Sequence, residues 1–329
     1  MTVDEVEEVS PAVVGTLSAI DGRPQVTYRL AGDSYLLLEY GDLVLDLTSR
    51  VRVHSLERAI HALHAPGIIE TAPGVRSLLI CYDCLKLRLP ELIEMLAAIE
   101  VELPPAEDME LPSRVVHLPI ACHDRWTAQA VAKYADSVRA EAPYVPDNME
   151  FIARCNGLEG SAEVEEYVMA TQHLVIGLGD VYLGAPCAVP LDPRRRLVVP
   201  KYNPARTWTP EGAVGIGGAY LCIYPMESPG GYQLFGRTLP IWNTMQSTRD
   251  FAEAPWLLRF FDRIQFEPVS EDELETLRAA MLDGGHAVRI EEGTFSVAEY
   301  CRFLDQVSDE ATAFKNKQDE AVVEATVGY

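Results

Sequence analysis

A chain of 329 residues exceeds an average single domain, and its 48% apolar content is enough to bury a core in each of two domains. Its 50 acidic residues outnumber 27 basic ones, and the formal charge of -23 would repel nucleic acid or an anionic membrane. No apolar run approaches the roughly 18 residues of a membrane span, and the acidic start lacks the basic and apolar regions of a signal peptide. We therefore expect a cytoplasmic protein with neither class as its partner.

The seven cysteines are odd in number and scattered in spacing, which predicts free thiols rather than a disulfide framework. Cys81 and Cys84 form a CxxC pair, but no second ligand pair of fitting spacing accompanies them, so a structural role is favoured over zinc or redox chemistry. His61 and His64 lie on one face of a predicted helix and are expected at its surface. We predict no metal site.

Residues 1–24 are acidic and weakly patterned, so we expect them to be disordered. From residue 25, strand-like runs broken at Gly-Asp pairs lead into a helix for which Ser55 is the expected N-cap. A further strand and an amphipathic helix complete a small N-terminal α+β domain over residues 25–103. The acidic, proline-bearing ELPPAEDMELPS marks its boundary.

Residues 113–247 begin with a strand and two or three helices and then become β-rich. HLVIGLG, RLVVPKY, AVGIGGAYLCIYP and YQLFGRT are short apolar runs separated by Gly and Pro, a pattern typical of a small barrel or sandwich. We predict a β-barrel domain with helical decoration.

Residues 255–329 are predicted to form a helical C-terminal extension, with capping boxes at Ser270 and Ser296. The last helix carries one apolar stripe at steps of three and four residues, made of Val297, Cys301, Leu304, Val307, Ala311 and Phe314. Packing on the chain's own barrel is favoured over docking on a partner, because most amphipathic stripes face a core.

Several long motifs recur in one order: GDSYLLLEYGD, APYVPDNMEFIARCNGL, GLGDVYLGAP, KYNPARTWTP, VGIGGAYLCIYPMESPGGYQLFGRT and GTFSVAEYCRFL. Together they resemble the carboxyltransferase region of biotin-dependent urea carboxylase. Within that region they are similar to the allophanate hydrolase subunit 1 or KipI-like family, which includes the B-type subunit of 5-oxoprolinase. GLGDVYLG replaces the Gly-Phe-x-Pro-Gly-Phe-x-Tyr-Leu-Gly pattern usual in the wider superfamily, which favours the urea carboxylase branch.

The resemblance implies an N-terminal α+β domain followed by a cyclophilin-like β-barrel. It also implies partners: an allophanate hydrolase subunit 2-like protein that shares the site, and a biotin carboxylase with a biotin carrier protein. The chain has no biotinylation motif, no P-loop and no Gly-x-Ser-x-Gly elbow. We thus expect no covalently bound cofactor, carboxybiotin delivered by another chain, and no activity from the chain alone.

The expected reaction moves a carboxyl group from carboxybiotin to urea or a related small amide or guanidine. Two alternatives stay open. One is a subunit of an ATP-dependent 5-oxoprolinase-type hydrolase, and the other is a KipI-like binding module that inhibits a histidine kinase.

The segment from Gly177 to Thr238 carries the candidate site, because its density of Gly and Pro exceeds what core strands need. Urea is neutral and rich in N–H donors, so a carboxylate is a sensible anchor. Asp180, set between glycines, is the first candidate, and turn capping is an equally weighted alternative. Tyr182 is a candidate substrate- or biotin-binding residue.

Lys201, Tyr202, Asn203 and Arg206 form a second cluster, on a backbone stiffened by prolines. Lys201, Asn203 and Arg206 are predicted to be catalytic, with the two cations holding a carboxylate and Asn203 hydrogen-bonding an amide. Tyr202 is predicted to line the pocket. Surface charges on a hairpin are the less favoured alternative.

The SPGGYQ turn contributes Tyr232 and Gln233, and Arg237 follows. The Gln233 amide can pair reciprocally with a ureido group, Tyr232 can cover a ring or pack in the core, and Arg237 is a further candidate to hold an anion. Arg194, Arg195 and Arg196 are left outside the site, because adjacent arginines more often mark a solvated loop.

Overall fold

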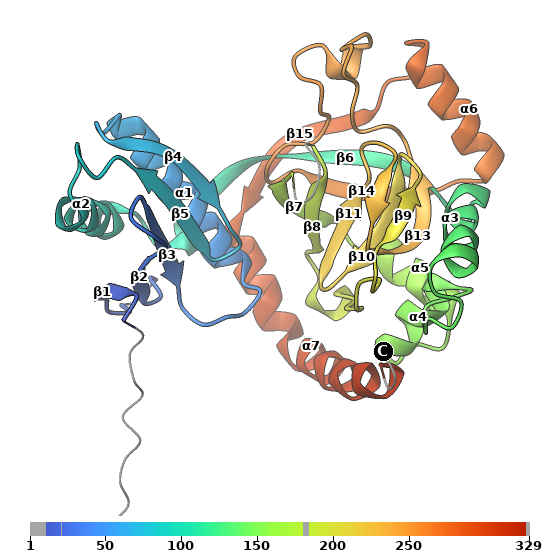
Figure 1. Ribbon diagram of the computed structural model, residues 1–329, viewed down its shortest axis with the longest axis horizontal. Coiled ribbons are helices and arrows are strands. Elements are labelled where there is room, and N and C mark those ends of the chain that lie inside the picture. The colour runs from blue at the N-terminus through green and yellow to red at the C-terminus, as the bar shows by residue number, and fades with distance from the viewer. Residues whose placement is uncertain (1–10, 21, 180–183, 327–329) are drawn as a thin grey trace, which may run out of the picture. The chain divides into compact units, whose positions relative to one another are not determined.

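The computed structural model describes residues 11–20, 22–179 and 184–326. The chain divides into unit 1, Met1–Glu110 with Ser296–Cys301, and unit 2, Leu111–Phe295 with Arg302–Tyr329 (Figure 1). Each unit has a hydrophobic core of its own. The predicted α+β fold class is confirmed.

Unit 1 is an antiparallel sheet in the order β1-β2-β3-β5-β4, covered by two helices. Its elements are β1 Val13–Leu17, β2 Val26–Leu30, β3 Tyr35–Tyr40, α1 Leu47–Leu63, β4 Ile68–Pro73, β5 Ser77–Tyr82, α2 Leu89–Glu102 and the short η1 Ala106–Asp108. Alternate strand residues such as Leu36, Leu38 and Ile80 meet Leu56 and Leu96 in one core, so both helices lie on the same face.

Helix α1 begins at Leu47 because the carboxylate of Asp46 accepts the N–H groups of Thr48 and Ser49, at 2.9 and 3.1 Å. The predicted N-cap, Ser55, lies inside the helix, so that prediction is wrong. Polar residues without strict periodicity in the first two turns hid the true start of the helix.

Unit 2 is built around a closed barrel of seven strands in the order β13-β10-β11-β8-β7-β14-β6, with β13 pairing back to β6. The strands are β6 Glu110–Cys122, β7 His173–Leu178, β8 Pro186–Pro190, β10 Ala213–Gly217, β11 Tyr220–Ile223, β13 Gln233–Thr238 and β14 Arg263–Pro268. A separate ribbon pairs β9 Arg206–Thr209 with β12 Ser228–Gly230, and β15 Arg289–Ser296 adds to β6.

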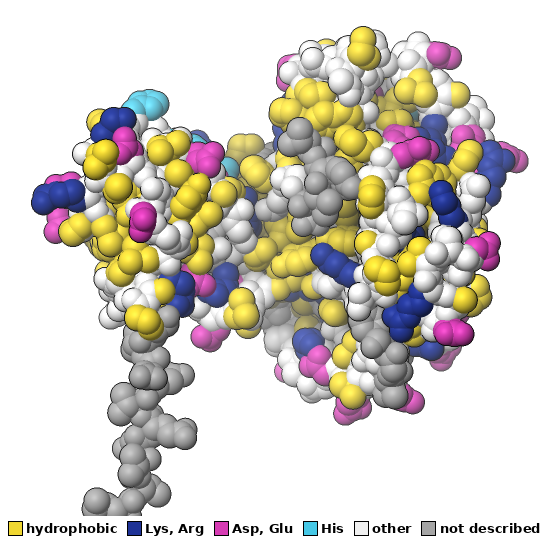
Figure 2. Space-filling view, viewed as in Figure 1, with side chains coloured by type: hydrophobic (Ala, Val, Ile, Leu, Met, Phe, Trp, Pro, Cys, Tyr) yellow, Lys and Arg dark blue, Asp and Glu magenta, His cyan; other side chains and the backbone are white. Residues whose placement is uncertain are grey.

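Helices flank this barrel (Figure 1). They are α3 Arg125–Ser137, α4 Asn148–Cys155, α5 Ser161–Met169, α6 Glu271–Leu282 and α7 Val297–Ala325, with short turns η2 Pro193–Arg195 and η3 Arg249–Phe251. None of the helices in the described ranges is both long enough and apolar enough to cross a membrane. On the visible face of unit 2, Lys and Arg side chains are interspersed with acidic ones (Figure 2).

The C-terminal part of helix α7 packs on unit 2, against α5 and the residue that follows α4. Phe314 lies 5.6 Å from the ring of Tyr167, and the buried Gln318 donates to Oδ1 of Asn156 at 2.6 Å. Arg194 pairs with Glu310 on the same helix at 2.6 Å. At least one arginine of the Arg194–Arg196 triplet therefore fastens the helix instead of lying free in a solvated loop.

Three elements depart from the predicted boundaries. Strand β1 lies within residues 1–24 and pairs with β2. Strand β14, which completes the barrel, lies beyond residue 247 and pairs in parallel with β6 across Arg263–Pro268 and Val115–Ile120. The extension from residue 255 thus contains β14 and β15 as well as helices. Such pairings join residues far apart in the sequence, so the hydrophobic pattern of neighbouring residues does not predict them.

Candidate functional site

The two predicted site segments, residues 200–206 and 228–233, meet in unit 2. The backbone N–H of Tyr202 donates to the carbonyl of Gly231 at 2.6 Å, and Nη1 of Arg206 donates to the carbonyl of Tyr232 at 2.6 Å. The structure therefore joins Lys201, Tyr202, Asn203, Arg206, Tyr232 and Gln233 in one cluster, called here the loop cluster.

Arg206 lies at the buried centre of the loop cluster. Its side chain is 1% exposed, and its guanidinium lies 4.3 Å from the ring centroid of Tyr202. Nη2 also approaches the hydroxyls of Thr209 and Tyr224, at 3.3 and 3.4 Å. Burial raises the pKa of Tyr224 to about 12, and the nearby guanidinium opposes the rise. These contacts make Arg206 the support on which the loop is built.

Lys201 and Asn203 are exposed at the rim of the loop cluster. The Lys201 ammonium lies 4.8 Å from the ring centroid of Tyr232, a cation–π contact. The backbone N–H of Asn203 donates to the hydroxyl of Tyr144 at 2.9 Å, and its side-chain amide faces outward. A cation and an amide are thus exposed together on one loop.

Gln233 and Tyr202 are buried, which limits what they can bind directly. Nε2 of Gln233 donates to the carbonyl of Pro200 at 2.9 Å, and Oε1 has no hydrogen-bond partner within the described ranges. Because Gln233 is 0% exposed, a ligand reaches this amide only if the loop moves. Tyr232 is also buried, at 4% exposed, and its ring forms the cation–π contact with Lys201.

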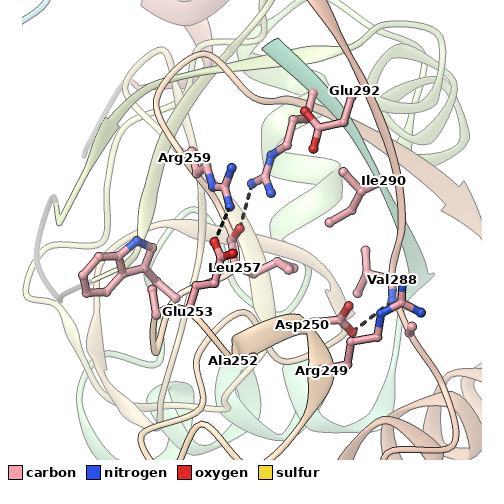
Figure 3. A pocket seen from close by; sticks show the side chains of 13 residues that line it. Arg249, Asp250, Ala252, Glu253, Leu257, Arg259, Val288, Ile290 and Glu292 are labelled. Atoms are coloured by element: carbon pink, nitrogen blue, oxygen red, sulfur yellow. Dashed lines mark hydrogen bonds and ion pairs between the residues drawn. The ribbon is translucent and has the colours of Figure 1, made fainter. Parts of the chain in front are cut away.

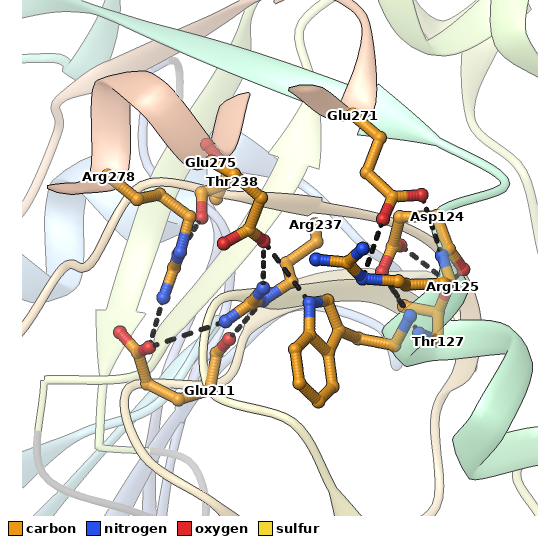
Figure 4. Close-up of polar contacts among 10 residues, drawn as sticks. Asp124, Arg125, Thr127, Glu211, Arg237, Thr238, Glu271, Glu275 and Arg278 are labelled. Atoms are coloured by element: carbon orange, nitrogen blue, oxygen red, sulfur yellow. Dashed lines mark hydrogen bonds and ion pairs between the residues drawn. The ribbon is translucent and has the colours of Figure 1, made fainter. Parts of the chain in front are cut away.

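Arg237 lies outside the loop cluster, in an ion-pair network that fastens α6 to the barrel (Figure 4). Its guanidinium pairs with Glu275 at 2.7 Å and donates to the carbonyl of Glu211 at 2.9 Å. Trp126 packs against it, with the guanidinium 5.3 Å from the ring centroid, and Arg278 pairs with Glu211. The charge that was predicted to hold an anion is thus already neutralised by carboxylates.

Asp180 and Tyr182 lie outside the described residues, so their predicted roles stay predictions. Gly184, the first described residue after them, is closely packed: a Cβ there, where φ is 78°, would lie 2.7 Å from the ring of Trp242.

Asn148 is a site residue that the sequence reasoning missed. It is 3% exposed, and its Oδ1 accepts the N–H of Leu234 at 2.9 Å while Nδ2 donates to the carbonyl of Tyr144 at 2.7 Å. Both amide atoms also bond to the hydroxyl of Tyr202. Asn148 stands in the motif APYVPDNMEF, but an Asn at the start of a helix is readily explained as a capping residue, so the sequence alone does not indicate its tertiary role.

A pocket of about 120 Å³ lies beside Asn148, between the starts of α3 and α4. Its polar lining includes His123, Asp124 and Asp147, and its apolar lining includes Phe235. At about 30 Å³ per water molecule, this volume suits a ligand of a few non-hydrogen atoms.

The two carboxylates of this pocket differ in how many of their oxygens accept hydrogen bonds. Both oxygens of Asp124 accept hydrogen bonds, from the N–H groups of Trp126 and Thr127 and from the Thr127 hydroxyl. Asp147 caps α4 with Oδ1 alone, which accepts the N–H of Met149 at 2.8 Å. Within the described ranges its Oδ2 accepts no hydrogen bond and remains open to a ligand that carries N–H donors.

The CxxC cysteines and the two histidines singled out in the sequence belong to unit 1, whereas the loop cluster belongs to unit 2. Cys81 is buried while Cys84 is exposed, and every cysteine is a free thiol. His61 is exposed and contacts the hydroxyl of Thr71. In the part of the chain that is described, no group of three or more His, Cys, Asp and Glu side chains is placed to hold a metal ion.

A family model described as carboxyltransferase domain, subdomain C and D, matches residues 26–252. Urea amidolyase of Lachancea kluyveri is 43% identical over 298 residues, which are 91% of this chain and 16% of that protein. The B-type subunit of 5-oxoprolinase from Bacillus subtilis is 27% identical over 261 residues, covering 74% of this chain and 92% of the relative. The crystal structure of K. lactis urea amidolyase superposes with a TM-score of 0.86 at 40% identity, covering 96% of this chain and 19% of that one.

These comparisons confirm the predicted resemblance and its urea carboxylase branch, since identity is higher to the urea amidolyase than to the oxoprolinase component. The chain spans about a sixth of the length of that curated urea amidolyase, so it corresponds to one region of a larger enzyme. The chain belongs to the carboxyltransferase-domain family of subdomains C and D.

Proposed function

We propose that this chain is the subunit 1 half of a urea carboxylase-type carboxyltransferase, acting with an allophanate hydrolase subunit 2-like partner on urea or a related small amide. The observation that carries the proposal is 43% identity to a urea amidolyase across 91% of the chain. Because the match is one region of that enzyme, we assign the biotin carboxylase and biotin carrier functions to other chains.

The pocket beside Asn148 is the proposed substrate subsite. Urea presents N–H donors in one plane, and the free Oδ2 of Asp147 is a charged acceptor that such donors prefer. Phe235 and Met149 line the same pocket and limit its contact with water, which strengthens the hydrogen bond. We therefore propose Asp147 as an anchor for urea, while the role predicted for Asp180 stays a prediction.

Lys201 and Asn203 are the proposed contacts for the incoming biotin carrier. Bound carboxybiotin supplies the carboxyl group. The Lys201 ammonium would stabilise the carboxylate, and the Asn203 amide would orient the ureido ring. The buried Arg206 keeps the loop in place, since its contacts span both segments of the loop cluster. Closure of the site against water is assigned to the partner.

The test is reconstitution with a subunit 2-like protein, a biotin carboxylase and a biotin carrier protein. We expect bicarbonate-dependent ATP turnover that requires urea, guanidine or another small amide and is abolished by avidin. Turnover that persists with avidin would reject the carboxyltransferase and favour the oxoprolinase-type hydrolase. Inhibition of a histidine kinase by the chain alone, without turnover in the mixture, would favour the KipI-like alternative.

The substrate subsite is tested with Asp147→Asn. Asn is as good an N-cap as Asp, so α4 is retained while the charged acceptor is lost. We expect KM for urea to rise about 10- to 100-fold, the loss of one charge-assisted hydrogen bond. The matched control is Asp46→Asn, which makes the same change at the N-cap of α1 in unit 1 and should leave KM unchanged. An unchanged KM in Asp147→Asn would remove this residue from the site.

A further inference from the structure

A cavity of about 680 Å³ in unit 2 shares no lining residue with the loop cluster and has no role in the proposed reaction. One wall comes from the segment after η3, with Trp256 and Leu257, and the other from Val288, which precedes β15, and from Ile290 and Glu292 within it (Figure 3). Trp256 is 44% exposed there, a large aromatic surface in contact with water. This cavity is called the β15 groove below.

Strand β15 is an edge strand. It is the last in the order of the eight-stranded sheet, and among the described strands its only neighbour is β6. The backbone groups along its outer edge are therefore available for a further strand. An available edge beside a groove is the arrangement by which extended peptides add to a sheet.

The two faces of β15 do different work. On one face, Arg289 and Glu291 join His117 and Glu267: Glu291 lies 3.1 Å from Nε2 of His117, and Arg289 lies 3.0 Å from Glu267. On the other face, the alternate residues 288, 290 and 292 line the groove. The contacts of Arg289 and Glu291 fix the strand from one face, and the residues of the other face line the groove.

The ends of the groove carry opposite charges. Arg249 lies at the Val288 end, where Asp250 accepts the N–H of Val288 at 3.1 Å, and Glu292 lies at the other end (Figure 3). Arg114 also lines the groove, and Glu292 is close enough to it for their charges to interact, whereas the Arg249 side chain forms no hydrogen bond or ion pair in the described ranges. Four residue steps along β15 cover about 13 Å, so the groove face matches a strand of about five residues.

We propose that an extended segment of the subunit 2-like partner adds to the outer edge of β15 and fills this groove. The segment would place apolar side chains against Leu257 and Ile290, an acidic residue near Arg249 and a basic one near Glu292. The inference rests on the proposed function, because it concerns the same partner.

Two observations favour this occupant over a second copy of the chain. The net charge of -23 makes two copies repel each other. In addition, the matched region is 16% of the length of the urea amidolyase relative, so in that protein it belongs to a polypeptide with much further sequence available to cover its surfaces.

The test combines hydrogen exchange with affinity, on the full chain and the purified subunit 2-like protein. On binding, we expect amides of Arg289–Ser296 to exchange at least about tenfold more slowly. Arg249→Glu and Glu292→Lys should each weaken binding about tenfold without changing avidin-sensitive turnover at saturating partner. The controls Arg302→Glu and Glu320→Lys reverse exposed charges on α7 and should bind as the unchanged chain does.

A complex that forms and turns over urea while β15 keeps its exchange rates would overturn the docking site and leave the proposed function standing. A complex that protects β15 but shows no avidin-sensitive turnover would support the docking site and reject the proposed function. Protection of β15 by increasing concentration of the chain alone, with dimers in sedimentation, would assign the groove to a second copy and reject the proposed occupant.

Discussion

The side-chain amide of Asn148 and the hydroxyl of Tyr202 form a reciprocal pair, with Nδ2 and Oδ1 lying 2.7 and 2.9 Å from the phenolic oxygen. The pair joins the first residue of α4 to the loop that carries Lys201 and Asn203. Because Tyr202 also lies beneath the guanidinium of Arg206, one amide fixes both the loop and its buried cation.

Replacing Asn148 should destabilise unit 2. Asn148→Leu leaves the N–H of Leu234 and the carbonyl of Tyr144 without their partner in a buried setting, which costs about 1–3 kcal/mol for each such group. We expect the unfolding free energy to fall by about 3 kcal/mol, measured by guanidinium denaturation. All four tryptophans lie in unit 2, so their fluorescence reports on this unit. Asn203→Leu, at an exposed side chain, should change it by less than about 0.5 kcal/mol.

The two glycines of the SPGGYQ turn should differ in their tolerance of a methyl group. A Cβ on Gly230 would collide with the ring and hydroxyl of Tyr224, whereas one on Gly231 would approach nothing closer than 3.6 Å, at Lys201. Gly230→Ala should therefore lower the stability of unit 2 by about 1–3 kcal/mol through overpacking. Gly231→Ala should be nearly neutral in the same denaturation assay, and equal losses in the two variants would contradict this account.

The stability of unit 2 should fall in mild acid through His173. Burial lowers the pKa of His173 to about 4, below its ordinary value of 6.5, and Nδ1 has no partner in the described ranges. The unfolded chain then binds the proton first, so stability is complete above pH 6.5 and declines as pH falls toward 4. The expected slope is about 1.4 kcal/mol per pH unit.

His173→Phe removes the titrating group and keeps an aromatic ring beside Phe266, whose centroid lies 5.6 Å away. Its tryptophan-detected unfolding free energy should lose most of the slope between pH 6.5 and 4. His61→Phe, at an exposed position in unit 1, should keep the full slope. A slope unchanged in His173→Phe would assign the acid sensitivity to other groups.

The thiols should react in the order of their exposure. Cys84 is exposed, whereas burial raises the pKa of the Cys122 and Cys155 thiols to about 12. With iodoacetamide at pH 8, mass spectrometry should find Cys84 alkylated first and Cys155 only after unfolding. Early modification of Cys155 in the native protein would show that its surroundings open readily in solution, against this prediction.

Local signals in the sequence were enough for much of the fold. Ser270 caps α6 as predicted, its hydroxyl accepting the N–H of Glu273 at 3.2 Å, and Phe314 of the predicted stripe packs against the core of unit 2. Alternation and Gly-Pro punctuation also predicted a barrel. These features are encoded within a few residues, where propensity and periodicity act directly.

Closure of the barrel depends instead on pairings that periodicity does not encode. Strand β14 lies beside β6 although about 150 residues separate their paired positions, such as Gln265 and His117. The short run RIQFEP gives no local sign of its neighbour, since register is fixed by which faces become buried once the chain has collapsed.

The sequence by itself determined the family and the segments that build the loop cluster, because long motifs in a fixed order carry both. Only the tertiary structure decided the state of each side chain. It buries Arg206 and Gln233, neutralises Arg237 with Glu275, exposes Lys201, and leaves one oxygen of Asp147 free. Burial and pairing are properties of neighbours brought in from distant parts of the chain, so residue type and spacing do not specify them.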